Sequence, residues 1–297
     1  MVLRPPPNRL VLPPLPHRPR DTDKSKMGRV LVVAGSHGMA GAAALTTEAA
    51  MRSGCGYAYV ATAACIAPQL TAALPSAILR HSMNREKTQL RWDDLPMLYD
   101  ALQSVDSVVV GPGIGDTCEE WLGDFLARLN GAPTVFDADA LNAIARRREW
   151  LQQLSSSHVL TPHAGETARL LGWGDDSHRV NSARQSAISE LCTATRATIV
   201  LKGADTLIAQ RGAPTTTNLT GNAGLAKAGS GDVLSGVIAA LLARGMRALD
   251  AAIAGAWLHG RAADLLASEV GEEAYISSDL ARALGRAFSD YAASARA

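Results

Sequence analysis

The sequence has no excess of charge of either sign, few aromatic residues and no long apolar run, and each absence excludes a class of function. Lys and Arg total 29 and Asp and Glu total 28 among 297 residues, so no net positive charge indicates binding to nucleic acid or to an acidic membrane surface. Aromatic residues make up only 4% of the chain, too few for a platform that stacks bases. Because no run of about eighteen apolar residues occurs, no membrane-spanning helix is expected.

Cysteine is also scarce. The four cysteines lie far apart and form no CxxC pair, so neither a disulfide framework nor a zinc site is predicted. The apolar stretch after the basic N-terminus is too short for a signal peptide. These features are typical of a cytoplasmic protein with reduced thiols.

Proline, in contrast, is concentrated in one place. Residues 1–20 hold seven of the fourteen prolines. Proline at this density favours an extended arm, which we expect to be solvated or to clasp a neighbouring subunit. The sequence therefore predicts a proline-rich N-terminal arm over residues 1–27 and one domain over residues 28–297.

The rest of the chain alternates short β-rich runs with amphipathic helical stretches. Strands that alternate with helices of ten or more residues indicate βαβ units, and hence an α/β fold with a mostly parallel central sheet covered by helices on both faces. After Asp232 the pattern becomes helical, over 233–244, 248–268 and 278–294. The predicted strands cover 29–34, 57–62, 107–111, 133–139, 158–162 and 197–203.

Nearly every predicted strand is followed by a distinctive loop. In open parallel sheets, ligands bind outside the carboxyl ends of the strands, and glycines let the backbone approach them closely. Five such loops on one edge predict a long cleft with room for more than one ligand, which favours an enzyme over a structural module. The loops read GSHGMAG (35–41), GPGIG (111–115), DADALN (137–142), TPHAGE (161–166) and KGADT (202–206).

Two common glycine motifs are excluded. A phosphate-binding P-loop requires Lys where GLAKAGSG has Ser230, and its Lys227 comes too early. A dinucleotide-binding turn requires GxGxxG after the first strand and an acidic residue about twenty positions on. The first loop has the wrong spacing, and the second strand ends in Val60–Ala61–Thr62 without a carboxylate. A hydride-transferring dehydrogenase is therefore not expected.

The segment GNAGLAKAGSGD (221–232) leads into a strongly apolar helix. Free N–H groups in the first turn of a helix bind phosphate oxygens, and Gly229 and Gly231 keep that approach open. Asp232 has two interpretations: an N-cap that stabilises the helix, or a general base beside the phosphate site. The abundance of glycine, beyond what a cap requires, favours the base.

In order along the chain, AGSHGMAGAA, VVVGPGIG, VFDADALNAIA, LTPHAGE, VLKGADTLIA and TGNAGLAKAGSGDVLSG resemble the ADP- or ATP-dependent NAD(P)H-hydrate dehydratases. That resemblance covers about residues 28 to 290 and implies a ribokinase-like αβα sandwich. GSGD alone indicates the wider superfamily, whereas TPHxGE, DADALN and NAG ahead of GSGD are specific to the dehydratases. The epimerase domain that precedes this one in some relatives is not found here, which suggests a functional link to a separate epimerase.

The resemblance implies a role for each matching position. Ala42, Gly113, Gly115 and His163 would contact the hydrated dinucleotide. Asp232 would touch the substrate and act as the catalytic base, and Asn222 would face the site. The co-substrate would be ADP or ATP with Mg²⁺, and the assembly a homotetramer. The nucleotide would be bound by Lys202, Gly203, Ala204, Asp205, Thr206, Gly229 and Gly231.

Several residues keep two interpretations. Asp137 and Asp139 could hold Mg²⁺ through water, although Asp139 could equally cap the helix that begins at Ala140. Without the family pattern, His163 would be taken as a packed loop histidine, and Glu166 as a residue of the first turn of a helix. His259 is predicted to be buried among helices.

The chain departs from the family pattern at two positions before GSGD. Lys227 stands where a small hydroxyl residue is usual, and would either contact phosphate or lie in solvent. Ala228 replaces a glycine, and because alanine tolerates positive φ poorly the loop is expected to change its path. These changes keep open the alternative of an inactive nucleotide-binding protein. A kinase of a small hydroxylated metabolite, which would use the same GSGD site, is the other alternative.

Overall fold

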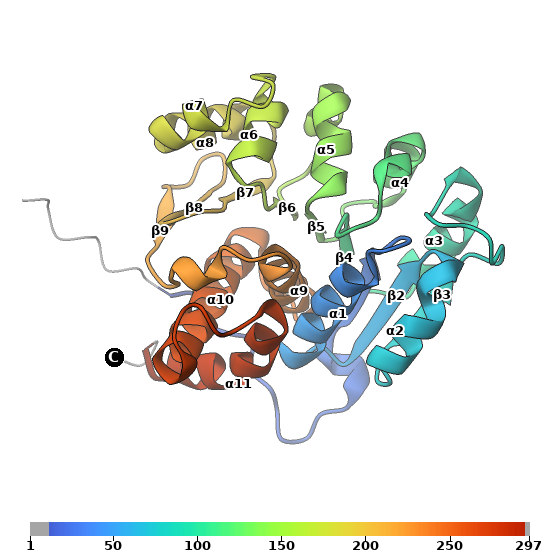
Figure 1. The fold of residues 1–297 in the computed structure, drawn as a ribbon, viewed down its shortest axis with the longest axis horizontal. Coiled ribbons are helices and arrows are strands. Elements are labelled where there is room, and N and C mark those ends of the chain that lie inside the picture. The colour runs from blue at the N-terminus through green and yellow to red at the C-terminus, as the bar shows by residue number, and fades with distance from the viewer. Residues whose placement is uncertain (1–11, 295–297) are drawn as a thin grey trace, which may run out of the picture.

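The computed structural model describes residues 12–294, and its nine strands form one sheet (Figure 1). The strand order is β3-β2-β1-β4-β5-β6-β7-β8-β9; neighbours from β3 to β7 pair in parallel, and β7–β8–β9 pair antiparallel. The mostly parallel α/β sheet predicted from the alternation is thus confirmed. The strands are β1 (Arg29–Val33), β2 (Tyr57–Thr62), β3 (Ile78–His81), β4 (Ser107–Val110), β5 (Thr134–Phe136), β6 (His158–Leu160), β7 (Thr198–Leu201), β8 (Thr206–Ala209) and β9 (Thr216–Asn218).

The six predicted strands are all present, and most end earlier than predicted because their last residues leave the sheet to form the loops. Three strands, β3, β8 and β9, were not predicted. β3 lies at the edge of the sheet and is mostly exposed, so its sequence ILRH lacks the apolar run of a central strand. β8 follows the KGADT loop directly and pairs antiparallel with β7, which the expectation of βαβ units did not anticipate.

Helices cover both faces of the sheet (Figure 1). Successive residues of β1 alternate between two hydrophobic cores, with Val30 and Val32 in one and Leu31 and Val33 in the other. The first core is covered by α1 (Ala40–Arg52), α2 (Ala67–Ala73), α9 (Ser230–Ala243), α10 (Ala248–Val270) and α11 (Ser277–Ser294). The second is covered by α3 (Leu95–Leu102), α4 (Leu122–Arg128), α5 (Asp139–Arg146), α6 (Ala164–Leu171), α7 (Ser177–Ser182) and α8 (Arg184–Ala194). Short 3₁₀ helices are η1 (Lys24–Met27), η2 (Ala64–Ile66), η3 (Trp92–Asp94), η4 (Asp116–Glu120), η5 (Arg148–Gln153) and η6 (Ala223–Leu225).

Helix α9 is buried along most of its length. Its residues from Val233 to Ala243 are all buried. A Cβ on Gly236 would lie 2.9 Å from the Ala49 Cβ, so the close crossing of α9 and α1 requires glycine. The Ser107 hydroxyl donates to the Ala239 carbonyl over 2.8 Å and ties α9 to β4. The N-terminus of α9 is therefore held firmly at the carboxyl edge of the sheet.

The proline-rich segment packs on its own chain where the structure describes it. Leu12 and Leu15 are half-buried against the first core, and the Tyr291 hydroxyl donates to the Pro13 carbonyl over 2.7 Å. The Arg244 guanidinium donates to the Pro16 carbonyl over 2.6 Å. The prediction of a solvated arm is wrong for residues 12–16, because their carbonyls and leucines find partners on α9 and α11. Residues 17–20 are exposed, as expected of a solvated segment, and residues 1–11 lie outside the described residues.

Deletion of residues 1–20 should lower the melting temperature by a few degrees and leave turnover nearly unchanged. The deletion exposes apolar surface beneath Leu12 and Leu15 and removes two hydrogen bonds, about 2 kcal/mol together. These contacts lie at the C-terminal end of α9, about 20 Å from its N-terminus at 1.5 Å per residue. Thermal melts and turnover of the truncated protein test this, with Tyr291→Phe as a control that removes one hydrogen bond. A large loss of turnover would contradict it.

Candidate active site

The candidate site lies at the N-terminus of α9, and the helix begins earlier than the sequence suggested. Its first residue is Ser230, and Gly229 is the N-cap with φ of 87°. Asp232 is therefore the third residue of the helix, so its interpretation as an N-cap is wrong. The left-handed conformation of Gly229 sets this start, because few other residues adopt it without strain. Asp232 lies within the turn whose N–H groups are free to bind an anion.

A single lysine neutralises the centre of the site. The Lys202 ammonium donates to Asp137 Oδ1 over 2.9 Å and lies 3.8 Å from Glu166 Oε2. A Cβ on Gly231 would lie 3.2 Å from Lys202 Nζ, so the glycine allows the ammonium to approach the start of α9. The tertiary structure thus places a cation, a helix N-terminus and the carboxyl groups of Asp137, Glu166 and Asp232 together.

These groups strongly perturb one another's ionisation. Burial, assisted by the Asp137 carboxylate and opposed by the Lys202 ammonium, raises the pKa of Asp232 to about 7. Burial also raises the pKa of Glu166 to about 7, again against the effect of Lys202. Burial alone would lower the pKa of Lys202, but Asp137 and Glu166 outweigh it and the pKa is raised. A carboxyl group with a pKa near neutrality is suited to accept and release a proton.

The aspartates of DADALN hold the site together. Asp137 accepts hydrogen bonds from the Ser235 hydroxyl over 2.7 Å and from the Ala138 N–H over 2.9 Å, besides that from Lys202. Asp139 is the first residue of α5 and accepts from the Gly115 N–H over 2.9 Å, whereas the N-cap is Ala138. The cap interpretation of Asp139 is therefore wrong. Within residues 12–294 no group of three or more His, Cys, Asp or Glu side chains is placed to hold a metal ion directly.

Of the predicted substrate residues, Gly115 contacts Asp139, and Gly113 packs against Ala42. Gly113 has φ of 57°, and a Cβ there would lie 3.0 Å from the Ala42 Cβ, so the GPGIG loop rests on the start of α1. The Ser36 hydroxyl donates to the Gly113 carbonyl over 2.8 Å, and Gly115 is bound to Asp139. The start of α1 at Ala42 and the GPGIG loop at Gly113, about 70 residues apart in the sequence, are thus packed against each other.

His163 stands at the other side of the same centre. It is the N-cap of α6: its Nδ1 accepts from the N–H groups of Gly165 and Glu166, and Glu166 Oε2 accepts from the His163 N–H over 2.8 Å. Its side chain is 55% exposed, so it is not a packed histidine. Burial and then the Lys202 charge lower the pKa of His163, which keeps the imidazole neutral with its proton on Nε2. Nε2 lies 3.5 Å from Glu166 Oε1, so the ring faces the same carboxyl group as Lys202.

A cavity of about 820 Å³, the main cavity, lies between the KGADT loop and α10. Its volume is that of a typical small-molecule site, and it has both charged and apolar walls. The apolar wall consists of Leu219, Leu225, Leu234 and Ala256. Of the residues predicted to bind nucleotide or to face the site, it is lined by Lys202, Gly203, Ala204, Asp205, Thr206, Asn222 and Gly231.

Two predicted site residues have mainly structural contacts. The φ of Gly229 and the 2.5 Å that would separate its Cβ from the Leu45 side chain show that glycine is needed there for the backbone. Asn222 lines the main cavity, but its Oδ1 accepts from the Tyr275 hydroxyl over 2.7 Å and its Nδ2 donates to Asp264 over 3.1 Å. Both residues fix the conformation of the loop that precedes α9.

Comparison with known proteins identifies the family. Residues 30–286 match the family model described as NAD(P)H-hydrate dehydratase. The chain belongs to the NAD(P)H-hydrate dehydratase family.

Individual relatives agree with this assignment. The chain is 38% identical over 275 residues to a bifunctional NAD(P)H-hydrate repair enzyme of Thermofilum pendens, covering 92% of this chain and 52% of that one. It is 38% identical over 259 residues to an ADP-dependent (S)-NAD(P)H-hydrate dehydratase of Neisseria meningitidis, covering 86% of this chain and 82% of that one. The chain thus spans about half the length of the bifunctional relatives it matches, as with Thermofilum pendens.

Solved structures show the same fold. An ADP/ATP-dependent NAD(P)H-hydrate dehydratase of Bacillus subtilis, co-crystallised with ATP and Mg²⁺, superposes with a TM-score of 0.76 at 26% identity, covering 93% of this chain and 94% of that one. A ribokinase-like superfamily protein of Enterococcus faecalis gives 0.78 at 27% identity, with coverage of 93% and 92%. The ribokinase-like α/β fold expected for this dehydratase family member is confirmed.

Two residues of this site, Glu166 and His259, were not predicted from the sequence to belong to it. Glu166 lies in the first turn of α6, as predicted, but its buried carboxyl also faces Lys202. His259 is buried, as predicted, and its Nε2 lies 3.2 Å from the Ser230 hydroxyl at the start of α9, where it lines the main cavity. The position of Glu166 three residues after His163 is the spacing of a capping box and was the available signal. For His259 the sequence carried no signal, since α10 is apolar around it.

The two positions that depart from the family pattern before GSGD both have contacts of their own, and the expectation for Lys227 is wrong. The Lys227 ammonium neither lies in solvent nor is aimed at the phosphate site: it donates to the carbonyls of Glu272 over 2.7 Å and Tyr275 over 2.8 Å, and lies 4.4 Å from the centre of the Tyr275 ring. The φ of Ala228 is not positive, and its carbonyl accepts from the Ser277 hydroxyl over 2.6 Å. Lys227 therefore joins the loop before α9 to the loop before α11.

Replacement of Lys227 should weaken the attachment of the loop before α9 without abolishing catalysis. Lys227→Met keeps the aliphatic stem but removes the charged hydrogen bonds, each worth about 1.5–3 kcal/mol. We expect a melting temperature several degrees lower and a kcat reduced about three- to tenfold. Lys227→Arg, which keeps the charge, should recover most of both. An unchanged melting temperature for Lys227→Met would show that the contacts contribute nothing.

Proposed function

We propose that this chain dehydrates the (S)-epimer of hydrated NADH or NADPH at the expense of ADP or ATP, restoring NADH or NADPH and releasing phosphate and AMP or ADP. Membership of the family supports the reaction class. The observation that carries the proposal is the Asp232 carboxyl group, with a pKa of about 7, on the first turn of α9 beside Lys202.

The chemistry follows from the groups at this helix end. Hydroxide is a poor leaving group, so the hydroxyl of the hydrated ring is first phosphorylated. Asp232 accepts the hydroxyl proton while the oxygen bonds to the terminal phosphorus of the nucleotide and the bond to AMP or ADP breaks. The N–H groups of α9 and the Lys202 ammonium stabilise the charge on the transferred phosphoryl group. The ring nitrogen lone pair then expels phosphate, and loss of a ring proton restores the conjugated ring.

Mg²⁺ fits this site only through phosphates and water. The Asp137 carboxylate is already engaged by Lys202, Ser235 and Ala138, and Asp139 by Gly115. Asp137 and Glu166 would therefore reach the hydrated ion through its water ligands. When bound, Mg²⁺ would neutralise charge on the nucleotide phosphates.

One assay separates this function from its rivals. The purified protein is mixed with ADP or ATP, Mg²⁺ and hydrated NADH, and absorbance is followed in the reduced-nicotinamide band. Recovery of NADH with release of phosphate is expected. A stable phosphorylated product would indicate a metabolite kinase instead, and nucleotide binding without turnover would indicate an inactive protein.

The pH profile should reflect the perturbed carboxyl group. Because burial raises the pKa of Asp232 to about 7, the base is protonated below that pH and ionised above it. We therefore expect kcat/KM to rise about tenfold per pH unit up to pH ~7 and then to level off. Glu166→Gln serves as the control, because Glu166 titrates in the same range. A break that disappears in Glu166→Gln would assign the titration to Glu166.

We further propose that the protein acts in the cytoplasm as a homotetramer, on small-molecule substrates supplied by a separate hydrate epimerase, without a nucleic-acid or membrane partner. The family resemblance is the reason for expecting a tetramer, since the alanines of α10 pack into the first core. In the part of the chain that the structure describes, every helix is too short or too polar to cross a bilayer. Sedimentation at micromolar concentration tests the assembly, and a monomer would contradict it.

A further inference from the structure

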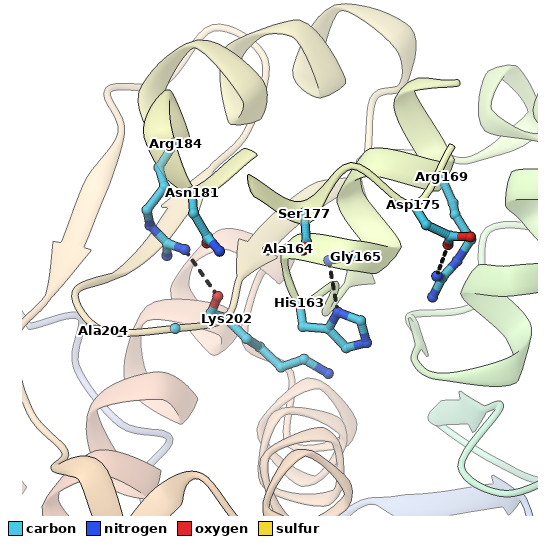
Figure 2. A pocket seen from close by; sticks show the side chains of 11 residues that line it. His163, Ala164, Gly165, Arg169, Asp175, Ser177, Asn181, Arg184, Lys202 and Ala204 are labelled. Carbon is cyan, nitrogen blue, oxygen red and sulfur yellow. Dashed lines mark hydrogen bonds and ion pairs between the residues drawn. The ribbon is translucent and has the colours of Figure 1, made fainter. Parts of the chain in front are cut away.

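A second cavity opens on the far side of His163 and the KGADT loop (Figure 2). It has a volume of about 640 Å³ and lies between the N-terminus of α6, helix α7 and the start of α8. It shares His163, Lys202, Gly203 and Ala204 with the main cavity, so these residues form a wall between the two. We call it the α7–α8 cavity.

The lining of the α7–α8 cavity differs sharply from that of the main cavity. It contains three cationic side chains, Arg169, Arg184 and Lys202, against one carboxylate, Asp175. Asn181 and Ser177 stand at its exposed rim and present further polar groups. Among the described residues that line it, none is aromatic or a large aliphatic, whereas the main cavity has Leu219, Leu225 and Leu234. The main cavity therefore suits a base, and the α7–α8 cavity suits phosphate and ribose.

The cations of the α7–α8 cavity are not equally available. Arg169 is bound to Asp175 over 2.6 Å, and Lys202 to Asp137 over 2.9 Å. The half-buried Arg184, in contrast, donates to the carbonyls of Leu201 over 3.0 Å and Lys202 over 3.3 Å. Burial lowers its pKa, and the charge of the Asp205 carboxylate opposes that effect. Its charge at the floor of the cavity is thus the one best able to bind an anion.

Arg184 is also held in place by the KGADT loop. Gly203 has φ of 141°, and a Cβ there would lie 2.8 Å from Arg184 Nη1. The glycine therefore leaves room for the guanidinium, which points from α8 toward Lys202 and Ala204 (Figure 2). An anchored guanidinium loses little entropy when it binds a phosphate.

We propose that the α7–α8 cavity binds the phosphate-bearing adenylate half of the hydrated dinucleotide. This inference rests on the proposed function. The co-substrate has its terminal phosphate at Gly231 and Lys202 and its base in the main cavity, so it has no reason to extend across the wall. The reacting ring of the dinucleotide lies at Asp232, and its diphosphate and adenylate half must extend away from that residue. His163 lies between Asp232 and Arg184, on the path that they would take.

The test places a negative charge in the α7–α8 cavity without removing a side chain that holds the fold together. Asn181→Glu and Ser177→Glu change exposed rim residues, and Ser189→Glu on the exposed side of α8 is the matched control. NADH, NADPH, reduced nicotinamide mononucleotide and ADP are titrated against each protein, by fluorescence for the reduced nucleotides and by calorimetry for ADP. These binding measurements do not depend on turnover. Failure of the proposed function would instead appear as absence of turnover in the unaltered protein.

We expect the Kd of NADH and NADPH to rise about tenfold in Asn181→Glu and Ser177→Glu, since like charges repel across a short distance. The Kd of reduced nicotinamide mononucleotide and of ADP should change less than about twofold, as should every Kd in Ser189→Glu. A larger effect on NADPH than on NADH would place the 2′-phosphate, rather than the diphosphate, beside Arg184. Any of four results would overturn the proposal. The variants could weaken ADP binding selectively, weaken mononucleotide and dinucleotide binding equally, or change no Kd at all; or the unaltered protein could fail to bind NADH.

Discussion

Replacement of Asp232 by Asn should reduce turnover by at least about a hundredfold while the protein remains as stable as before. The amide keeps the shape of the carboxylate on the first turn of α9 but cannot accept the hydroxyl proton, and a placed general base contributes about 10²–10⁴-fold. Among residues 206 to 249 Asp232 is the only acidic residue, so no neighbour in that segment can replace it. Nucleotide binding should change little, because the backbone N–H groups of α9 remain.

The stability of this variant gives an independent check. Burial raises the pKa of Asp232 from 3.8 to about 7, so the folded state binds a proton that the unfolded state releases between those values. The carboxyl group therefore lowers stability as pH rises through that range, and the loss is complete above pH ~7. Asp232→Asn removes this term, so its melting temperature at pH 8 should equal or exceed that of the unaltered protein. Near-normal recovery of NADH by the variant would refute the role of Asp232 and direct attention to Asp137 or His163.

Replacement of Lys202 by Met should damage both turnover and stability. The ammonium lies within 4 Å of the carboxyl groups of Asp137 and Glu166, and it faces Gly231 at the phosphate site. Without it the transferred phosphoryl group loses its charged partner, and turnover should fall at least about a hundredfold. Removal of one partner of a buried pair costs about 3–5 kcal/mol, so the melting temperature should fall by several degrees.

A double variant separates the two effects. In Lys202→Met with Asp137→Asn, the uncompensated carboxylate is gone, while the amide can still bond to Ser235 and Ala138. We expect this protein to regain most of the lost melting temperature and none of the turnover. Recovery of turnover in the double variant, or near-normal turnover in Lys202→Met alone, would show that the ammonium acts only on stability.

The sequence was informative wherever a feature is local. Apolar runs separated by amphipathic stretches predicted the six central strands, the three C-terminal helices and the parallel sheet. Burial on both faces leaves a strand as a continuous apolar run, and burial on one face gives a helix its period, and both are visible in a short window. The loops at the strand ends could be placed on one edge for the same reason, since parallel strands all end on that side. The GSGD segment predicted a helix N-terminus with a carboxylate, and this is what α9 presents.

The tertiary structure alone decided which of these groups meet. The bond between Lys202 and Asp137 joins residues 65 positions apart, and the perturbed pKa of Asp232 arises from burial and from that neighbouring pair. The carbonyls that hold Lys227 lie more than 40 residues away, in the loop before α11. No local pattern encodes such contacts, because they depend on how the sheet orders its strands and on which loops its edge brings together. The start of α9 at Ser230 likewise depends on Gly229, which is left-handed and has no room for a Cβ beside Leu45.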